Sequence, residues 1–354
     1  MADVPAGARL ILGNLLAEDD LARLGHTGGP RRRQPRETVR QTAARLAAQL
    51  RVFARDGDRL WTPASGPLAA VAPAPEVLAW CETPDAVRLR TAPRAGEVPW
   101  DAPLCELVWH LPAAPPAVVA AVHHRAFHLR VAEALGCALP GARMVESPAE
   151  LDRVLAARAA PPSWVVKAPL SAAGRDRYIA KDGPFADPRL KDQKSRRTVE
   201  RLFEKHGPLL FEPWLDRIAD YGCAALLTAA ELRIVGIHRQ QVDGKGQFAG
   251  IDPLAMDADL PDRDRERFLE IVEGVASALR REGYAGPFGV DAWSYRRPDG
   301  GAAFHPLGEI NARMTFGLVA WAAQSNPPLP DAIRWGYSIP STVSPSAGKF
   351  RSNE

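Results

Sequence analysis

The chain contains 354 residues, of which 46% are hydrophobic and 25% charged, so it is long enough for several packed subdomains and lacks the composition of a disordered or collagen-like protein. Its 45 basic and 42 acidic residues give a formal net charge of +3, which is too balanced to indicate a nucleic acid or an anionic membrane as a partner. The 4 cysteines form no Cys-x-x-Cys pair, which argues against a structural zinc site and a secreted disulfide framework.

The N-terminal residues lack the basic start and the apolar run of a secretory signal peptide. The most apolar long stretch, residues 107–122, includes His110 and several prolines, so it does not predict a membrane-spanning helix. We therefore expect a cytoplasmic protein without a membrane partner.

Residues 1–115 are expected to form an N-terminal α/β lobe. The lobe contains no G-x-G-x-x-G or Walker sequence, so we assign no nucleotide to it. Its expected elements are a short buried strand at 9–14, a helix over 15–24, an exposed loop at 25–38, an amphipathic helix at 39–54, and strands at 77–80 and 86–89.

Residues 116–212 are expected to form the small subdomains. A proline-rich joint at 112–116 leads into them, and Ser147-Pro-Ala-Glu150 has the sequence of a capping box at a helix N-terminus. The expected elements are a long helix at 117–136, a strand at 142–145, a helix from residue 147, a strand at 164–167, a loop at 171–177, a helix at 196–206 and a strand at 208–211.

Residues 213–340 are expected to form a C-terminal subdomain, and residues 341–354 a flexible tail. The expected elements are strands at 221–228 and 232–241, a charged helix at 261–282, and strands at 287–296 and 302–311 that are joined by the turn Pro298-Asp-Gly-Gly301. Helices and strands mixed in this way predict the α/β class.

The last predicted hairpin carries the strongest functional signal. Asp291 and Glu309 are equidistant from residue 300, so an antiparallel pair closed there would set their Cβ atoms ~5 Å apart. Asn311 follows Glu309 by two positions and is expected on the same face. Two carboxylates and an amide oxygen are suited to Mg²⁺, which also takes phosphate oxygens. The alternative is a solvated hairpin edge whose acids bind no metal.

The residues around these acids are apolar, as in Phe288-Gly-Val-Asp291. Because a buried charge without a partner is costly, an acid in such a strand requires a cation. Arg313 continues the alternation of Glu309 and Asn311 and is expected on the same side. It either forms a salt bridge to one of the acids, or holds an anionic substrate and a developing negative charge.

Lys167 ends an apolar strand and leads into the small-residue loop 171–177. A lysine directed at a phosphate, beside a loop whose N–H groups could cover that phosphate, is a reasonable nucleotide site. The alternative is a solvated lysine at the end of a strand.

The segment Glu212-Pro-Trp-Leu215 follows an apolar strand and has the character of a linker between subdomains. Pro213 stiffens it, and Trp214 offers a flat face for packing. The alternative is a strand exit with a core tryptophan.

His123, His124 and His128 fall on the predicted long helix, and the last two have the i, i+4 spacing of a metal pair. No Glu-x-x-His pattern accompanies them, so we interpret all three as ordinary helix residues.

Taken in chain order, these motifs resemble the ATP-grasp superfamily over about residues 117–325. That family has a strand lysine, a glycine-containing loop over the phosphates, a Glu-led hinge at the adenine, and a late Asp … Glu-x-Asn set that holds Mg²⁺. The final motif is especially similar to the Glu-x-Asn-x-Arg of the biotin-carboxylase branch. The resemblance implies an N-terminal pre-ATP-grasp lobe followed by a two-subdomain ATP-grasp fold with antiparallel sheets.

The resemblance also implies a role for each matching residue. By this resemblance, Lys167 contacts the phosphates of ATP, and the loop with Ser171, Gly174 and Arg175 closes over them. Glu212 contacts the adenine amino group, and the ring is lined by Pro213, Trp214 and Leu215. The ribose hydroxyls are contacted by Asp220, with Asp216 as the alternative. The implied metal ligands are Asp291, Glu309 and Asn311, and Arg313 would face the reacting carboxylate or acyl phosphate.

ATP-grasp enzymes usually supply a second basic residue upstream of the strand lysine, and this chain has no lysine before Lys167. Arg125 and Arg130 on the predicted long helix are the candidates. Arg239 could hold a substrate carboxylate or be a surface residue of its strand, and Asp252 is a guess for a general base.

The function implied is an ATP-dependent ligase that joins a carboxylate to an amine or thiol through an acyl phosphate, releasing ADP and phosphate in a biosynthetic reaction. The alternatives are a phosphotransferase acting on a hydroxyl and a nucleotide-binding scaffold without turnover. The expected cofactors are ATP and Mg²⁺, with Mn²⁺ as a substitute. The expected partners are small-molecule or peptide substrates, and a homodimer is expected because dimers are the commonest oligomers.

Overall fold

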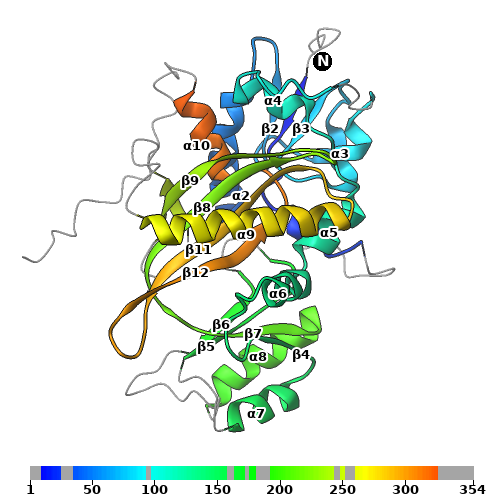
Figure 1. The fold of residues 1–354 in the computed structure, drawn as a ribbon. Helices are drawn as coiled ribbons and strands as arrows, with labels where there is room; N and C mark the ends of the chain where they lie inside the picture. Colours follow the sequence, from blue (N-terminus) through cyan, green and yellow to red (C-terminus); the bar gives the residue numbers. More distant parts are fainter. Residues whose placement is uncertain are drawn as a thin grey trace, which may run out of the picture.

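The computed structural model describes residues 9–24, 35–92, 97–157, 163–171, 175–180, 192–242, 248–251 and 260–325. These residues form three sheets, which follow one another along the chain. Figure 1 shows the N-terminal lobe at the top, a long twisted sheet in the middle and a smaller sheet at the bottom. The fold class is the expected one, a mixture of helices and strands with antiparallel sheets after an N-terminal lobe.

The N-terminal lobe contains a parallel sheet in the order β2-β1-β3. Its strands are β1 (Leu10–Leu12), β2 (Arg59–Trp61) and β3 (Val77–Ala79). Its helices are α1 (Glu18–Leu21), α2 (Glu37–Ala47), the 3₁₀ helices η1 (Ala48–Phe53) and η2 (Leu68–Ala70), α3 (Pro84–Leu89) and α4 (Leu104–His110). The helix expected over 15–24 is therefore a single turn, and the helix expected at 39–54 begins earlier and ends in 3₁₀ geometry.

The strand expected at 86–89 is wrong, because this segment belongs to α3. The Thr83 side chain accepts a hydrogen bond from the Ala86 N–H at 3.4 Å, and Pro84 occupies the first helical turn. A capping threonine and a proline at this position both favour a helix start. The short apolar pattern of 86–89 fits either kind of element, and the cap decides between them.

The long helix expected at 117–136 is two helices, α5 (Pro116–His123) and α6 (Arg125–Ala134). The break is at His124, whose backbone is extended, and its Nδ1 accepts a hydrogen bond from the Ala126 N–H at 3.2 Å. This histidine therefore caps α6. The Arg125 N–H, freed from the helical pattern, donates to the Pro169 carbonyl at 3.0 Å, which ties the start of α6 to the loop after Lys167.

The small sheet is antiparallel, in the order β4-β7-β5-β6. Its strands are β4 (Arg143–Val145), β5 (Trp164–Lys167), β6 (Arg177–Ala180) and β7 (Leu209–Pro213), and its helices are α7 (Pro148–Ala156) and α8 (Gln193–His206). Ser147 accepts a hydrogen bond from the Glu150 N–H at 3.2 Å, as the capping sequence predicts. Trp164 and Phe211 are fully buried in a core separate from that of the large sheet.

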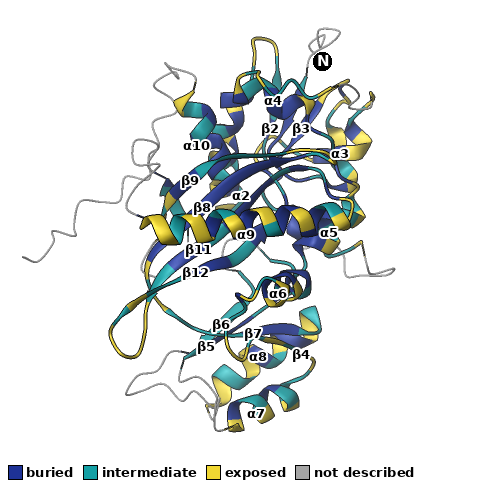
Figure 2. Cartoon of the chain, viewed as in Figure 1, coloured by how far each residue is buried: buried dark blue, intermediate teal, exposed yellow. Residues whose placement is uncertain are grey.

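The large sheet is antiparallel, in the order β10-β9-β8-β11-β12. Its strands are β8 (Asp216–Leu227), β9 (Leu232–Val242), β10 (Phe248–Ile251), β11 (Gly286–Arg296) and β12 (Ala302–Asn311). The long helix α9 (Asp262–Arg281) crosses one face, with its apolar side buried and its polar side exposed (Figure 2). The helix α10 (Phe316–Gln324) packs on the opposite face, where Gly236 of β9 leaves room for the ring of Trp321.

The hairpin β11–β12 pairs Asp291 directly with Glu309, as the sequence predicts, but its geometry is not the expected one. Near the turn, paired residues such as Trp293 and His305 are equidistant from residue 299, one position before the expected residue 300. Further along, a bulge sets the single residue Ala292 opposite the three residues 306–308. The extra residues shift the register, so that Asp291 and Glu309 are paired as expected. Pro306 has no N–H for the ladder, which suits a bulge position.

The bulge also explains Gly308, which lies under the ring of Trp293. A Cβ at this position would lie 1.8 Å from Cζ3 of Trp293. We expect Gly308→Ala to lower the free energy of unfolding by about 2 kcal/mol, because overpacking forces the ring to move. Chemical denaturation would measure this, with Gly250→Ala as the matched control, since a Cβ there would meet its nearest atom at 3.7 Å. Equal stability of the two variants would contradict the bulge geometry.

Candidate active site

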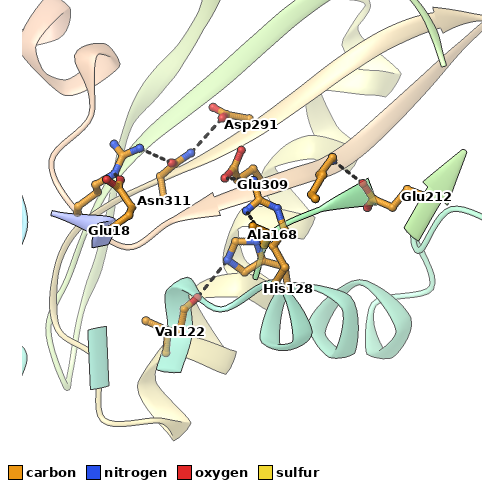
Figure 3. A network of polar contacts seen from close by, with 11 residues as sticks. Glu18, Val122, His128, Ala168, Glu212, Asp291, Glu309 and Asn311 are labelled. Carbon is orange, nitrogen blue, oxygen red and sulfur yellow. Dashed lines mark hydrogen bonds and ion pairs between the residues drawn. The ribbon is translucent and has the colours of Figure 1, made fainter. Parts of the chain in front are cut away.

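Polar residues from the large sheet, the small sheet and α6 meet between the two sheets (Figure 3). Asp291, Glu309 and Asn311 come from β11 and β12, and they share one face because paired and alternating positions project together. Lys167 and Glu212 come from neighbouring strands of the small sheet. The sequence motifs are therefore brought together by the fold.

The two opposed carboxylates have different electrostatic environments. Burial, with the charge of Glu309 added, raises the pKa of Asp291 to about 6. Burial would also raise the pKa of Glu309, but Arg125, Lys167 and Arg313 outweigh it and hold that pKa below its usual value. The pair therefore carries its negative charge mainly on Glu309 near pH 6.

Arg125 is the basic residue that reaches the acids. Its side chain is buried, lies 3.2 Å from Oε1 of Glu309, and donates to the Ala168 carbonyl at 3.3 Å. Arg130 is exposed and lines a separate cavity of about 150 Å³ with Phe127 and residues of α9. Of the two arginines left open by the sequence, only Arg125 lies with Lys167 and Glu309.

Lys167 and Glu212 form an ion pair, and their side chains are only 13% and 15% exposed. Burial lowers the pKa of Lys167, and Glu212 opposes this shift. Lys167, Glu212 and His305 of β12 line one small cavity, and burial lowers the pKa of His305 to about 4. The carboxylate to which the family resemblance gives the adenine thus contacts the lysine to which it gives the phosphates.

The segment after Glu212 runs from the small sheet into the large one. The Trp214 N–H donates to the Ser163 carbonyl at 2.9 Å, and the guanidinium of Arg217 lies 5.7 Å from the Trp214 ring and 3.6 Å from the Trp293 ring. Arg217 also donates to Asp220 at 2.7 Å. Pro213 ends β7, and Leu215 follows Trp214 in the connection to β8.

The two candidates for the ribose hydroxyls differ in burial. Asp220 is buried, and its carboxylate accepts the hydrogen bond from Arg217. Asp216 is exposed at the first position of β8, 3.6 Å from Arg296. Asp220 lies opposite Trp293 in the β8–β11 register, and it binds the arginine whose guanidinium contacts both tryptophan rings.

The phosphate loop expected at 171–177 is described only in part, and Gly174 lies outside the described residues, as does Asp252. Ser171 follows the loop segment that Arg125 contacts. Arg175 forms an ion pair of 3.7 Å with Asp19 of α1. One end of the loop therefore touches the N-terminal lobe.

Arg313 bridges the hairpin and the N-terminal lobe. It donates to Oδ1 of Asn311 at 2.8 Å, and its Nε lies 3.3 Å from the buried carboxylate of Glu18. Burial, with Arg313 next, lowers the pKa of His123 to about 3, so this helix residue is a neutral imidazole near the site. The sequence analysis missed Glu18, because nothing in its local pattern distinguishes it from a surface acid.

Arg239 is not brought to the site. It lies opposite Tyr221 in the β8–β9 register, while its neighbour Gln240 contacts Asp291. Successive side chains on a strand point to opposite faces. Arg239 is exposed and belongs to the face away from the two acids.

The donor set fits Mg²⁺ shared with a nucleotide. Within the described ranges, no group of three or more His, Cys, Asp or Glu is arranged to hold a metal by protein ligands alone. Two carboxylates and an amide leave coordination positions for phosphate oxygens and water, which is the usual way that Mg²⁺ is bound beside phosphates. Asn311 presents its Nδ2 to Asp291 here, so its Oδ1 would have to turn from Arg313 to bind a metal.

In the part of the chain that the structure describes, no helix combines the length and the apolar character needed to cross a membrane.

No protein-family model and no curated protein sequence matches this chain. Among solved structures it is similar to N5-carboxyaminoimidazole synthetase from Staphylococcus aureus complexed with ADP, with 10% identity, a TM-score of 0.48, and coverage of 89% of this chain and 72% of that one. L-amino acid ligase from Bacillus licheniformis gives 14% identity, a TM-score of 0.45, and coverage of 90% and 70%.

The biotin carboxylase domain dimer of 2-oxoglutarate carboxylase from Hydrogenobacter thermophilus, in complex with MgADP, ADP and bicarbonate, gives 15% identity and a TM-score of 0.43 over 58% of this chain. This chain spans 46% of the length of that one. All three TM-scores are modest, so the chemistry has to come from the site itself. These three structures are of a synthetase, a ligase and a carboxylase domain, and those of the synthetase and the carboxylase domain contain ADP.

Proposed function

We propose that this protein is an ATP-grasp ligase that joins a carboxylate to an amine or thiol through an acyl phosphate, forming ADP and phosphate. The observation that carries the proposal is the direct pairing of Asp291 with Glu309, beside Arg125 and between sheets that also supply Lys167. Paired acids with buried cations around them form a site for a metal-bound triphosphate.

We assign the nucleotide to the space between the two sheets. Lys167 and Arg125 would contact its phosphates, and Glu212 would accept a hydrogen bond from the adenine amino group. When the nucleotide binds, the ion pair between Lys167 and Glu212 would break. Lys167 would then contact the phosphates, and Glu212 the adenine amino group. Asp291, Glu309 and Asn311 would hold Mg²⁺, which supplies neutralisation of the phosphate charge.

The proposed reaction has two steps. A substrate carboxylate oxygen attacks the γ-phosphorus, the bond to the β–γ bridging oxygen breaks, and ADP leaves. The nitrogen or sulfur nucleophile then attacks the acyl carbon, phosphate leaves, and the nucleophile loses its proton. We assign Arg313, which donates to Asn311, to the reacting carboxylate, where it would offset the negative charge that develops on the acyl oxygen.

The proposal is tested by following ADP and inorganic phosphate when the full chain is incubated with ATP, Mg²⁺ and pooled amino acids. We expect both products to be released in equal amounts, and only when a carboxylate and a nucleophile are both present. ADP without inorganic phosphate, with the phosphoryl group on a hydroxyl acceptor, would instead identify a phosphotransferase. Binding of MgADP without turnover under any condition would identify a scaffold.

The remaining expectations from the sequence stay predictions. A homodimer would be detected by light scattering after size-exclusion chromatography, and a cytoplasmic location by cell fractionation. The subdomain boundaries near residues 115, 212 and 340 would be tested by limited proteolysis in the presence and absence of MgADP.

A further inference from the structure

One row of residues crosses four strands of the large sheet beside the proposed metal site. Glu309 pairs with Asp291, Asp291 with Gly222, and Gly222 with His238. Paired residues in adjacent strands project from the same face. The row therefore has a gap at Gly222, between the acids and the histidine.

The gap at Gly222 is filled by side chains from β9. A Cβ at Gly222 would lie 2.4 Å from Nε2 of His238 and 2.7 Å from Nε2 of Gln240. Both distances are too short for a side chain at this position. Only glycine leaves room here for the side chains of His238 and Gln240.

Gln240 uses the gap to cross over β8. Its Nε2 donates a hydrogen bond of 2.7 Å to Oδ1 of Asp291, although β9 and β11 are not adjacent strands. Asn311 donates to the other oxygen, Oδ2, at 3.0 Å (Figure 3). Among the described residues, each carboxylate oxygen of Asp291 thus accepts one side-chain hydrogen bond, and an oxygen of this kind can accept a second.

His238 limits where Gln240 can go. Its ring is buried between Gly222 and Gly317 of α10, and a Cβ at Gly317 would lie 2.0 Å from its Cε1. The close approach of α10 therefore fixes the ring, and the ring occupies the space beside the Gln240 amide. A continuous series of contacts therefore runs from α10 to the His238 ring, from that ring to the Gln240 amide, and from the amide to the carboxylate of Asp291.

We propose that Gln240 is a positioning residue that orients the carboxylate of Asp291 for metal binding, and that Gly222 provides the passage it needs. The inference rests on the proposed function, because it assigns a support to the metal site of that function. Residues that hold metal ligands in orientation commonly change metal affinity by ten- to a hundredfold when they are replaced.

The test measures Mn²⁺ binding to the full chain with saturating ADP, by electron paramagnetic resonance of the free ion. We expect Gln240→Ala to weaken Mn²⁺ binding at least tenfold, and Gly222→Ala to do the same by displacing the amide. The matched control is Gln241→Ala, which changes an exposed glutamine one position along the same strand and should bind Mn²⁺ as the wild type does. The melting temperature in EDTA is recorded for each variant.

The readouts separate positioning from simple structural damage. A loss of Mn²⁺ affinity in Gln240→Ala, with a melting temperature in EDTA close to that of Gln241→Ala, supports the inference. Wild-type Mn²⁺ affinity in Gln240→Ala overturns it, and this variant decides the matter even if Gly222→Ala fails to fold. Asp291→Asn tests the proposed function separately. If Asp291→Asn and Gln240→Ala both bind Mn²⁺ as the wild type does, the proposed metal site and the inference are both wrong. If Asp291→Asn loses Mn²⁺ binding and Gln240→Ala does not, the metal site is supported and only the role of Gln240 is wrong.

Discussion

Asp291→Asn is expected to make the metal-free protein more stable while removing metal binding. Burial and the nearby Glu309 raise the pKa of Asp291 to about 6, above the usual value of an aspartate. Above pH 6 the charged carboxylate therefore costs more free energy in the folded state than in the unfolded state. A neutral side chain removes this cost. We expect the free energy of unfolding at pH 8 to rise by roughly 2 kcal/mol.

The stabilisation has a defined pH dependence. Because the folded pKa is raised, the cost of the charge is complete above pH 6, declines as the carboxyl takes up a proton, and is absent below about pH 4. Urea denaturation of Asp291→Asn and wild type in EDTA at pH 8, 6 and 4 would measure the difference. In the same variant, Mn²⁺ affinity should fall at least a hundredfold, because one of two charged ligands is lost.

Glu309→Gln should change stability in the opposite direction. The cations around Glu309 hold its pKa below the usual value, so its charge stabilises the folded state above pH 5, and that contribution is lost as the pH falls through the folded pKa. Glu309→Gln is therefore expected to destabilise the metal-free protein at pH 8 and to lose Mn²⁺ affinity as Asp291→Asn does. Equal stability changes in the two variants would contradict the electrostatic difference between the paired acids.

Arg125→Met is expected to have the second large effect. Its guanidinium is buried, lies 3.2 Å from Glu309 and donates to the Ala168 carbonyl. Removing the guanidinium leaves the 36% exposed side chain of Glu309 with Lys167 and Arg313 as its neighbouring cations, and it leaves the Ala168 carbonyl without its donor. We therefore expect a loss of about 1 kcal/mol in the free energy of unfolding. Affinity for ADP should fall at least tenfold, because a cation facing the phosphates is lost.

Arg130→Met is the matched control for this change, because it removes the same groups from the exposed side of the same helix. Denaturation midpoints and calorimetric titration with MgADP would compare the two variants. A larger loss in Arg130→Met than in Arg125→Met would reverse the assignment of the upstream cation. In the double variant Arg125→Met, Glu309→Gln the stability losses should not add, because the second change removes the carboxylate charge with which Arg125 is paired.

The pairing of Asp291 with Glu309 could be predicted because side chains alternate strictly along a strand and the turn sequence marks where the hairpin closes. The route to that pairing could not. The turn is centred one residue earlier than expected, and the bulge at 306–308 compensates. Such a bulge depends on how Trp293 packs over Gly308, which is a contact between strands and has no local sequence signal.

The break between α5 and α6 was hidden for a different reason. No glycine or proline marks it, and the apolar pattern continues through residues 117–136. A histidine accepts the capping hydrogen bond, and the Arg125 N–H finds its acceptor at Pro169. In contrast, Thr83-Pro84 is a local signal for a helix start. The strand expected at 86–89 is wrong because a short apolar run fits either a strand or a helix, and the cap favours the helix.

The motif residues of the site could be predicted, but their supports could not. Glu18 and Gln240 each act at the site through a partner far away in sequence, Arg313 and Asp291 respectively. Both look like ordinary polar residues in their own segments. Only the pairing of strands and the packing of lobes show which of the many polar side chains face inward.

The single turn of α1 holds two parts of the molecule with contacts of unequal strength. Glu18 and Arg313 meet in the interior, whereas the ion pair of Asp19 with Arg175 is 48% and 30% exposed and hence weak and easily screened by salt. The buried pair therefore ties the N-terminal lobe to the large sheet more firmly than the exposed pair ties it to the segment after β5. Of the two contacts, the exposed one has the lower free-energy cost of separation.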